Sequence, residues 1–391
     1  MGPSRILFFI SSLACGGAEN HLLSLARLCK GMGWEVGICS ISPTENELDN
    51  RVLLDGISLY RVPLESLWEL MRVDKLRAIR KVLSVFHPDI IHAHLFHAEV
   101  VAYVASVVAH VPLVVTRHSY HLEFNGIRRI LIHLLQKRYS RVIAVSSEIA
   151  REARELGAGR EKVVVIENAV DTDRFRPLED SDRGVLRERL LKTYFGSGVS
   201  EKTVVIATVG GLKRVKNFSL FIEIASELVT LKEVISSGID LRFLIVGEGE
   251  LRRELEKIIS ESGLSDNVVL TGFIDRMEEM YPLFDILVIT SSSEGLPLTL
   301  LEAMSCGVSC VASSVGGIGD VLEGCGLVAP AGSRGDFVSA IRSLILDPAK
   351  RMEIGRKARV RVLERFNEDT WGYKIFSIYQ DILGERKKTK V

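Results

Sequence analysis

Short, almost wholly apolar runs alternate with segments of helical periodicity along most of this chain. Such runs are typical of parallel strands that helices cover on both faces. The helical pattern at 21–30 ends at Gly31, as a helix with a glycine at its C-terminus would. The alternation therefore predicts a doubly wound α/β fold. The first set of expected strands lies at 6–10, 36–41, 90–91, 113–115, 142–145 and 163–166.

The alternation breaks after Asp171 and restarts close to residue 203. The residues between are charged and weakly apolar, which predicts a linker with one short helix. We thus predict two Rossmann-like domains with parallel sheets, at 1–175 and 203–365, which are joined by a linker at 176–202 and face a central cleft. The second set of expected strands lies at 204–209, 243–246, 268–270, 286–289 and 308–311.

The composition excludes several classes of protein. Fifty Lys and Arg balance fifty Asp and Glu, and a zero net charge argues against a nucleic-acid-binding protein, which needs a basic face. The six cysteines are scattered without a C-x-x-C pair, which indicates reduced thiols in a cytosol-like compartment. No apolar run approaches the roughly 18 residues that span a bilayer, so we expect a soluble, cytoplasmic protein.

Two glycine-containing turns follow expected strands and open expected helices. Gly16 and Gly17 would let the backbone approach a phosphate at a helix N-terminus, and a tight turn without a ligand is an equal alternative. The turn lacks G-x-G-x-x-G spacing, and no acidic residue ends the second strand, so an NAD(P)-dependent oxidoreductase is disfavoured. The turn at 247–249 is a weaker signal of the same kind.

The most informative segment is 293–304, which follows an expected strand. Pro297 suits the first turn of a helix. The backbone N–H groups of Leu298, Thr299 and Leu300 would then be free to hold a diphosphate. This segment therefore predicts an anion-binding helix N-terminus.

Two glutamates flank that helix start. Glu294 would lie in the loop before the helix, and Glu302 would lie within the helix. Carboxylates accept strong hydrogen bonds from ribose or sugar hydroxyls. The alternative is a pair of ordinary surface glutamates, which the loop-Pro-helix setting after a buried strand makes less favoured.

An ordered set of short motifs runs through nearly the whole chain. The set resembles the retaining glycosyltransferases of family 4, which have the GT-B fold. The Glu-x7-Glu segment that begins at Glu294 is the most specific member, and the ordered set is stronger than any one motif. The motifs are GGAE (16–19), PDIIHAH (88–94), VVTRH (114–118), VIAVS (142–146), VIENAVDTDRF (165–175), VGGLKRVKN (209–217), VGEG (246–249), LTGF (270–273), EGLPLTLLEAM (294–304) and VGGI (315–318).

The resemblance implies an activity and a separate role for each of the two domains. The N-terminal domain would lie on the acceptor side, the C-terminal domain would bind the nucleotide sugar, and a helix at 366–391 with a basic tail would cross back to the N-terminal domain. The enzyme would move a sugar from a nucleotide diphosphate sugar (UDP-sugar favoured, GDP-sugar next) to a hydroxyl of a glycan or lipid-linked acceptor. It would retain the anomeric configuration and need no metal or other cofactor. Cell-envelope polysaccharide or glycolipid assembly is the commonest setting.

The resemblance also implies roles for residues of the C-terminal half. Glu302 would bind the ribose hydroxyls of the donor. Glu294 would touch the donor sugar near its reacting face, and Lys216 would neutralise the diphosphate. Gly249 and Phe273 lie in loops that frame the nucleobase.

In the N-terminal half, the resemblance implies that Gly16 and Gly17 approach the donor phosphates. His118 would contact the donor sugar. The expected catalytic residues are thus His118, Lys216 and Glu294.

One departure from the family pattern affects the expected donor site. The family carries an arginine five residues before the lysine, where this chain has Gly211. Lys213 or Arg214 would supply the missing charge from the same loop, or donor affinity would be weak. The loss of a charge-assisted bond to a buried phosphate costs about 1.5–3 kcal/mol.

Other functions stay open on the sequence alone. Another GT-B enzyme, such as a nucleotide-sugar epimerase, would share the fold. A non-catalytic nucleotide-sugar-binding protein would share the donor site and lack turnover, and the departure at Gly211 keeps this alternative open.

A histidine cluster raises the question of a metal. His92, His94 and His97 form an H-x-H-x-x-H pattern, and residues two apart share a strand face. No potential Cys, Asp or Glu ligand stands close by except Glu99. Structural or cleft-lining histidines are therefore favoured, and no metal is expected.

A basic segment raises the question of a membrane. Residues 127–141 carry five basic residues, no acidic residue and an apolar stripe. This pattern favours a sheet-covering helix with a solvated basic face. It leaves open a peripheral contact of the N-terminal half with the inner face of the cell membrane, for access to a lipid-linked acceptor.

Overall fold

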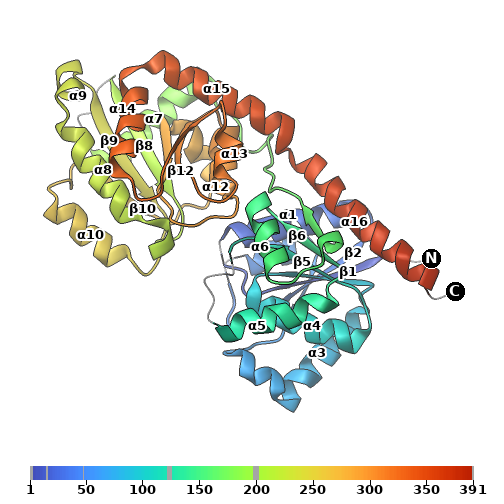
Figure 1. The fold of residues 1–391 in the computed structure, drawn as a ribbon. Helices are drawn as coiled ribbons and strands as arrows, with labels where there is room; N and C mark the ends of the chain where they lie inside the picture. Colours follow the sequence, from blue (N-terminus) through green and yellow to red (C-terminus); the bar gives the residue numbers. More distant parts are fainter. Residues whose placement is uncertain (1–2, 15, 47, 121–125, 197–201, 390–391) are drawn as a thin grey trace. The chain divides into compact units, whose positions relative to one another are not determined.

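The computed structural model describes residues 3–14, 16–46, 48–120, 126–196 and 202–389. Contacts divide the chain into an N-terminal unit, formed by Met1–Asn168 and Asp369–Val391, and a C-terminal unit, formed by Ala169–Glu368. Each unit is a parallel sheet with helices on both faces (Figure 1). The predicted α/β fold with two parallel-sheet domains is confirmed.

The N-terminal unit is built on a seven-stranded sheet in the order β3-β2-β1-β4-β5-β6-β7, with parallel pairing throughout the described strands. The order reverses between β1 and β4, and ligands of such sheets bind outside the carboxyl ends of the strands at this switch point. The strands are β1 (Arg5–Ile10), β2 (Glu35–Ser40), β3 (Ser58–Arg61), β4 (Ile90–His94), β5 (Leu113–Arg117), β6 (Arg141–Ala144) and β7 (Val163–Val165). The helices are α1 (Gly17–Gly31), α2 (Asp49–Leu54), η1 (Leu67–Met71), α3 (Val73–Phe86), α4 (Phe96–Ala109), α5 (Gly126–Leu135), η2 (Gln136–Arg138), α6 (Ser147–Glu155), η3 (Arg160–Lys162) and α16 (Glu368–Thr389).

The C-terminal unit is built on a six-stranded parallel sheet in the order β10-β9-β8-β11-β12-β13. Here the order reverses between β8 and β11, which places a second switch point there. The strands are β8 (Thr203–Val209), β9 (Asp240–Val246), β10 (Val268–Gly272), β11 (Ile286–Ile289), β12 (Ser309–Ser313) and β13 (Leu327–Ala329). The helices are α7 (Asp180–Phe195), η4 (Arg214–Lys216), α8 (Phe218–Thr230), α9 (Lys232–Ser237), α10 (Arg252–Glu261), α11 (Met277–Met280), η5 (Tyr281–Leu283), α12 (Leu298–Ser305), α13 (Ile318–Leu322), α14 (Arg334–Leu346) and α15 (Pro348–Arg365).

Two strands fall outside the predicted sets of strands. β3 and β13 each pair with one neighbour and form an edge of their sheet. Their side chains are mostly exposed or half-buried. β3 (SLYR) lacks a continuous apolar run, as expected for a strand that is not covered on both faces. β13 (LVA) is apolar but only three residues long, and the prediction misses it.

The predicted linker contains a full helix rather than a short one. α7 has 16 residues, and Arg183 and Arg187 form ion pairs with Asp285 at 3.2 and 2.5 Å. These pairs attach the helix to the C-terminal unit. The sequence looks like a linker because arginines, more than apolar side chains, hold this helix in place. The part of the predicted linker at 197–201 lies outside the described residues.

The contacts also set the ends of the two units. Val170, which the prediction assigns to the N-terminal domain, groups with the C-terminal unit, and its N–H donates to the Phe366 carbonyl at 3.0 Å. Residues Asp369–Val391 group with the N-terminal unit. There the Tyr379 Oη lies 2.6 Å from His92 Nδ1.

The cysteines that the structure describes carry free, buried thiols. Burial raises the pKa of Cys29 and Cys39 to about 12. A thiol with so high a pKa is a poor nucleophile. Cys15 lies outside the described residues. Among the described helices, none combines the length and the hydropathy that crossing a bilayer requires.

Candidate functional site

A lysine–glutamate pair lies at the switch point of the C-terminal sheet. Lys216 ends η4 after β8, and Glu294 lies in the loop after β11. Lys216 Nζ lies 2.6 Å from Glu294 Oε1, and the two side chains are 24% and 12% exposed. The Ser291 hydroxyl donates to the same carboxylate oxygen at 2.7 Å. The fold thus brings together two of the residues that the sequence nominates.

The backbone around this pair is tied together by hydrogen bonds between the two loops. The Ser292 N–H donates to the Val215 carbonyl at 2.8 Å. Thr290 Oγ1 lies 3.0 Å from the carbonyl oxygens of both Lys216 and Asn217. Because β8 and β11 are neighbours in the sheet, the loops that follow them form one polar surface.

A glycine of the VGGI motif supports the loop that carries Glu294. Gly316 has φ +54°, and a Cβ added there would fall 2.1 Å from the Glu294 carbonyl oxygen. The next residue, Gly317, donates its N–H to the Gly295 carbonyl at 2.8 Å. A side chain at 316 would therefore push directly on the backbone of the site.

We expect Gly316→Ala to destabilise the protein by about 1–3 kcal/mol, because the residue combines a left-handed backbone with a backbone clash. Urea unfolding of the variant measures this loss. The matched control is Gly184→Ala within α7, where an added Cβ meets nothing within 4 Å and should stabilise the helix by about 0.5–1 kcal/mol. Equal unfolding midpoints for Gly316→Ala and the unmodified chain would contradict the prediction.

Glu302 lies on α12 and is held by a tyrosine that sequence reasoning missed. The Tyr281 Oη donates to Glu302 Oε2 at 2.8 Å. Burial raises the pKa of Glu302, and the Tyr281 hydrogen bond opposes this rise. Burial also raises the pKa of Tyr281 well above its usual range. No motif in the sequence marks Tyr281, because its link to Glu302 is made only by the fold.

The start of α12 differs from the prediction in one respect. Pro297 lies just before the helix, with φ −71° and ψ 129°, rather than in its first turn. Its carbonyl accepts the Leu300 N–H at 3.2 Å, so this third N–H is already used and is not free for a phosphate. The N–H groups of Leu298 and Thr299 have no acceptor within the described part of the chain.

The loop around Gly211, where this chain departs from the family pattern, is basic and leaves room for a side chain at position 211. Lys213 and Arg214 are exposed, and neither forms an ion pair with another described residue. A Cβ added at Gly211 would lie 3.8 Å from Lys213 Cε and 3.9 Å from the Glu248 carbonyl oxygen. These are ordinary contact distances, so a side chain fits at position 211.

Close packing of the backbone requires a glycine at position 249, whether or not this loop contacts a nucleobase. A Cβ there would fall 2.7 Å from the backbone nitrogen and oxygen of Leu212, and φ is +158°. The Leu212 N–H donates to the Glu248 carbonyl at 2.9 Å, so the loops after β8 and β9 pack closely. Phe273 follows β10 and is half exposed.

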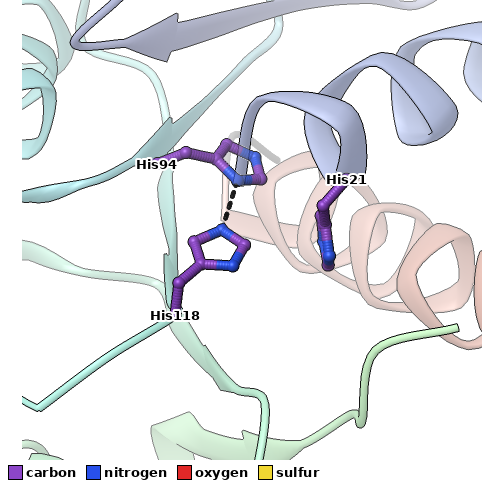
Figure 2. Close-up of side chains that lie close together, drawn as sticks. All are labelled: His21, His94 and His118. Atoms are coloured by element: carbon purple, nitrogen blue, oxygen red, sulfur yellow. Dashed lines mark hydrogen bonds between the residues drawn. The ribbon is translucent and has the colours of Figure 1, made fainter. Parts of the chain in front are cut away.

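In the N-terminal unit, three histidines gather near the switch point (Figure 2). His94 ends β4, His118 directly follows β5, and His21 lies on α1. His94 Nδ1 lies 3.0 Å from His118 Nε2. The rings of His21 and His118 meet edge to face with centroids 4.8 Å apart. We name these three residues the histidine triad; the sequence nominates His118 and His94 and misses His21.

His92 is structural, in line with the favoured interpretation of the H-x-H-x-x-H pattern. Its Nδ1 lies 2.6 Å from Tyr379 Oη and its Nε2 lies 2.8 Å from Thr116 Oγ1. Both ring nitrogens are thus used. The His92 and His94 rings lie close together, with centroids 4.4 Å apart, but the ring nitrogens that could share one ion belong to His21, His94 and His118.

The buried histidines are uncharged at neutral pH. Burial lowers the pKa of His21 to about 4, against a smaller opposing effect of its hydrogen bond to Asn168. Burial also holds the pKa of His92 and His94 well below the usual range. Neutral imidazoles can both donate and accept hydrogen bonds, which suits them to polar ligands.

The Gly16–Gly17 turn lies directly before α1. Gly17 is the first helical residue, and Gly16 precedes it without a side-chain cap. A Cβ added at Gly16 would fall 2.4 Å from Glu19 Oε2. This atom is the tip of a flexible side chain, so packing alone does not require a glycine at position 16.

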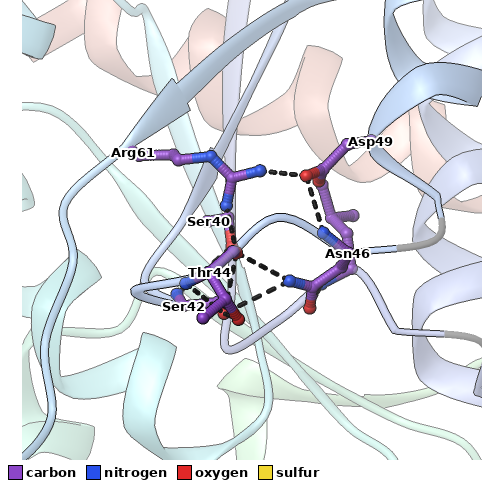
Figure 3. A network of polar contacts seen from close by, with 7 residues as sticks. Ser40, Ser42, Thr44, Asn46, Asp49 and Arg61 are labelled. Carbon is purple, nitrogen blue, oxygen red and sulfur yellow. Dashed lines mark hydrogen bonds and ion pairs between the residues drawn. The ribbon is translucent and has the colours of Figure 1, made fainter.

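A polar network supports this turn from the loop after β2 (Figure 3). Asn46 Oδ1 accepts the Leu13 N–H at 3.2 Å, and Asn46 Nδ2 donates to the Thr44 carbonyl at 2.7 Å. Arg61 of β3 donates to the same carbonyl at 2.7 Å and forms an ion pair with Asp49. These side chains hold the two loops together, and no sequence motif marks them.

Comparisons with known proteins match both units. The model of Glycosyltransferase Family 4 matches residues 15–174, and the model of Glycosyl transferases group 1 matches residues 192–361. The N-acetyl-alpha-D-glucosaminyl L-malate synthase of Bacillus anthracis is 24% identical over 312 residues, which cover 78% of this chain and 77% of that protein. The UDP-Gal:alpha-D-GlcNAc-diphosphoundecaprenol alpha-1,3-galactosyltransferase of Escherichia coli is 27% identical over 321 residues, covering 78% and 79%.

A solved structure matches along nearly the whole chain. The crystal structure of Anabaena HepE in complex with UDP and glucose has a TM-score of 0.83 at 22% identity, and the match covers 97% of this chain and 100% of that one. This likeness concerns the fold, and it confirms the predicted GT-B architecture.

Proposed function

Because the chain belongs to the glycosyltransferases of family 4 and group 1, we propose that it transfers a sugar from a nucleotide diphosphate sugar with retention of configuration. UDP-sugar is the favoured donor and GDP-sugar the next. The E. coli relative is named for a UDP-sugar donor and the HepE structure contains UDP, and both support this order. We propose a glycan or lipid-linked acceptor in cell-envelope polysaccharide or glycolipid assembly, which the diphosphoundecaprenol in that relative's name supports.

The Lys216–Glu294 pair, followed by the open first turn of α12, is the observation that carries this proposal. The two groups neutralise each other at 2.6 Å. A bound diphosphate would replace the carboxylate as the partner of Lys216, and sugar hydroxyls would replace the lysine as partners of Glu294. The N–H groups of Leu298 and Thr299 would add two donors and the positive end of the helix dipole.

The proposed sugar transfer requires positive charge close to the leaving diphosphate, because this group becomes more negative during the reaction. Lys216 and the N-terminus of α12 supply it without a metal. No side chain of the proposed donor site is an obvious nucleophile, so we propose front-face attack, in which the leaving phosphate takes the proton of the acceptor hydroxyl. Glu302 would bind the ribose, and His118 would hydrogen-bond a sugar hydroxyl. The anomeric configuration of an isolated product tests the stereochemistry.

A binding titration tests the donor site. The purified chain is titrated with UDP, GDP, ADP and NAD, and Glu302→Ala and Lys216→Ala serve as variants of the site. We expect one nucleoside diphosphate to bind tightly and both substitutions to weaken it. Binding that is absent, or indifferent to both substitutions, would contradict the proposal. Tight binding without turnover on any acceptor would favour the non-catalytic alternative.

We expect Gly211→Arg to tighten nucleoside diphosphate binding about tenfold. The substitution restores the cation that the family carries at this position, and a hydrogen bond between ionised groups contributes about 1.5–3 kcal/mol before solvent screening. Calorimetric titration measures the change, with Gly211→Gln as the uncharged control. Equal affinities of the two variants would show that position 211 does not face the phosphates.

We also propose that α5 and the basic residues after it touch an anionic membrane. Ile130 and Leu134 of α5 are 63% and 52% exposed, which a helix that only covers a sheet would not require. Arg129 is exposed on the same helix, and Lys137 follows it. Exposed apolar side chains beside cations are typical of interfacial helices. The side chains of residues 127 and 128 lie outside the described ones.

Flotation with liposomes tests this contact. We expect the chain to float with anionic vesicles more than with neutral ones, and Ile130→Ser with Leu134→Ser to reduce this flotation. The control is Leu54→Ser on α2, which is exposed as well and lies outside the basic segment. Equal flotation with both kinds of vesicle would refute the membrane contact.

A further inference from the structure

The histidine triad contains two buried ring nitrogens without a hydrogen-bond partner in the described structure. They are Nε2 of His21 and Nε2 of His94, and both side chains are buried. A buried polar atom left unpaired costs about 1–3 kcal/mol. The unpaired Nε2 of His21 points to a ligand that the triad is built to receive. His94 faces His118 with its Nδ1, so the unpaired Nε2 of His94 is not part of this argument.

The tautomer of His21 follows from its hydrogen bond to Asn168. His21 Nδ1 lies 2.9 Å from Asn168 Oδ1, and a carboxamide oxygen only accepts. His21 Nδ1 therefore carries the proton, and Nε2 presents a lone pair. A metal-binding histidine is held in the same way, with its second nitrogen donating to an oxygen. Trp371 packs edge to face on the His21 ring at 4.7 Å and holds its plane.

The spacing of the triad suits one tetrahedral ion. His94 Nδ1 and His118 Nε2 lie 3.0 Å apart, and one ring nitrogen from each of the three residues lies within 4.8 Å of the others. Two nitrogens that bind one ion at about 2.0–2.1 Å lie roughly 3.3 Å from each other. The His94–His118 pair is already near this spacing, and an approach of up to about 1.5 Å by the third nitrogen would close the site around an ion.

We propose that His21, His94 and His118 bind one divalent transition-metal ion of the Zn²⁺ type, and that the bound ion inhibits sugar transfer. Three imidazoles favour such ions over Mg²⁺ or Ca²⁺, which prefer oxygen ligands. Three protein ligands leave a fourth position open to water or a substrate oxygen. The proposed transfer itself needs no metal, so the ion acts as an inhibitor.

Inhibition follows from the role proposed for His118. The ion and the sugar hydroxyl would compete for the same imidazole, so the metal-bound form would lose this contact to the sugar. This consequence rests on the proposed function, whereas the metal site itself does not. The two are separated by measuring metal binding and nucleotide binding independently.

Cobalt is the first probe. The full chain is freed of metal with EDTA and titrated with Co²⁺, whose visible absorption reports nitrogen ligands, and equilibrium dialysis with Zn²⁺ gives the stoichiometry. We expect one ion per chain. His94→Asn and His118→Asn should each abolish the absorption, and Asn168→Leu should weaken Zn²⁺ binding about 10–100-fold, as the loss of a partner that orients a ligand does.

The matched control is His87→Asn. His87 is an exposed histidine with φ 50°, a conformation that asparagine adopts readily, and this variant should bind Co²⁺ like the unmodified chain. Circular dichroism and UDP titration identify variants that fail to fold. Absence of stoichiometric Co²⁺ binding, or unchanged binding in folded His94→Asn and His118→Asn, would overturn the site.

Inhibition is tested with Zn²⁺ in the transfer assay. We expect activity to fall with a midpoint that approaches the Zn²⁺ dissociation constant at low donor concentration and rises with the donor, and to return on addition of EDTA. Full activity at saturating Zn²⁺ would overturn the inhibitory role. A chain that binds Co²⁺ and no nucleoside diphosphate would support the metal site and contradict the proposed function instead.

Discussion

Lys216→Ala is expected to lower kcat/KM for sugar transfer about 10²–10³-fold. The lysine is the cation placed to stabilise charge that develops on the leaving diphosphate, and the loss of one such preorganised group has an effect of this order. Nucleoside diphosphate binding should weaken as well, by about tenfold or more, because the diphosphate already carries charge in the ground state. Steady-state kinetics and calorimetric titration measure the two effects separately.

Lys213→Ala is the matched control for this prediction. Lys213 lies in the same loop and is exposed, whereas Lys216 is half-buried and paired with Glu294. An exposed cation contributes less, because solvent and salt screen it. We therefore expect only a few-fold change. If Lys213→Ala costs as much as Lys216→Ala, the diphosphate is bound by the loop as a whole and the proposed site is wrong.

Glu294→Gln is expected to separate nucleotide binding from transfer. Without a donor, the carboxylate neutralises Lys216 at 2.6 Å. The amide removes this competitor and keeps an oxygen to accept the Ser291 hydroxyl, so UDP should bind as well as before or a few-fold more tightly. Transfer should fall about 10–100-fold, because the charge-assisted bonds from carboxylate to sugar hydroxyls are lost.

The control for Glu294→Gln is Glu256→Gln on α10, which removes the same charge from an exposed glutamate that pairs with Arg252. This variant should match the unmodified chain in both measurements. A parallel fall of UDP binding and transfer in Glu294→Gln would contradict the proposed exchange of partners. It would indicate instead that Glu294 is needed for the shape of the loop.

Local sequence patterns account for most of the strands and for the division into two sheets. Most buried central strands appear as apolar runs, because helices cover both of their faces, and β4 is an exception because it carries the buried His92 and His94. The edge strand β3 lacks this signal because it is largely exposed, and β13 is missed because it is an apolar segment of only three residues. The sequence pattern also fails to predict the full length of α7, because arginines that pair with Asp285 attach this helix.

The sequence motifs identify several residues of the site, but they do not show which of these residues contact each other. Lys216 and Glu294 are nominated separately, and the ion pair between them appears only in the fold. Tyr281, which donates to Glu302, belongs to no motif. Gly316 belongs to the VGGI motif, but its contact with the backbone of Glu294 appears only in the fold. The Leu300 N–H is misjudged, because the acceptor is the carbonyl of the proline expected inside the helix.

The sequence by itself determined the fold class, the family and the loops in which a donor site would be built. These follow from periodicity and from short motifs, which are local properties of the chain. The tertiary structure alone decided which side chains meet, as in the histidine triad, whose members come from α1, the end of β4 and the residue after β5. The physical reason is that a parallel sheet brings the carboxyl ends of its strands together at one edge. The distance between residues along the sequence does not predict which side chains meet there.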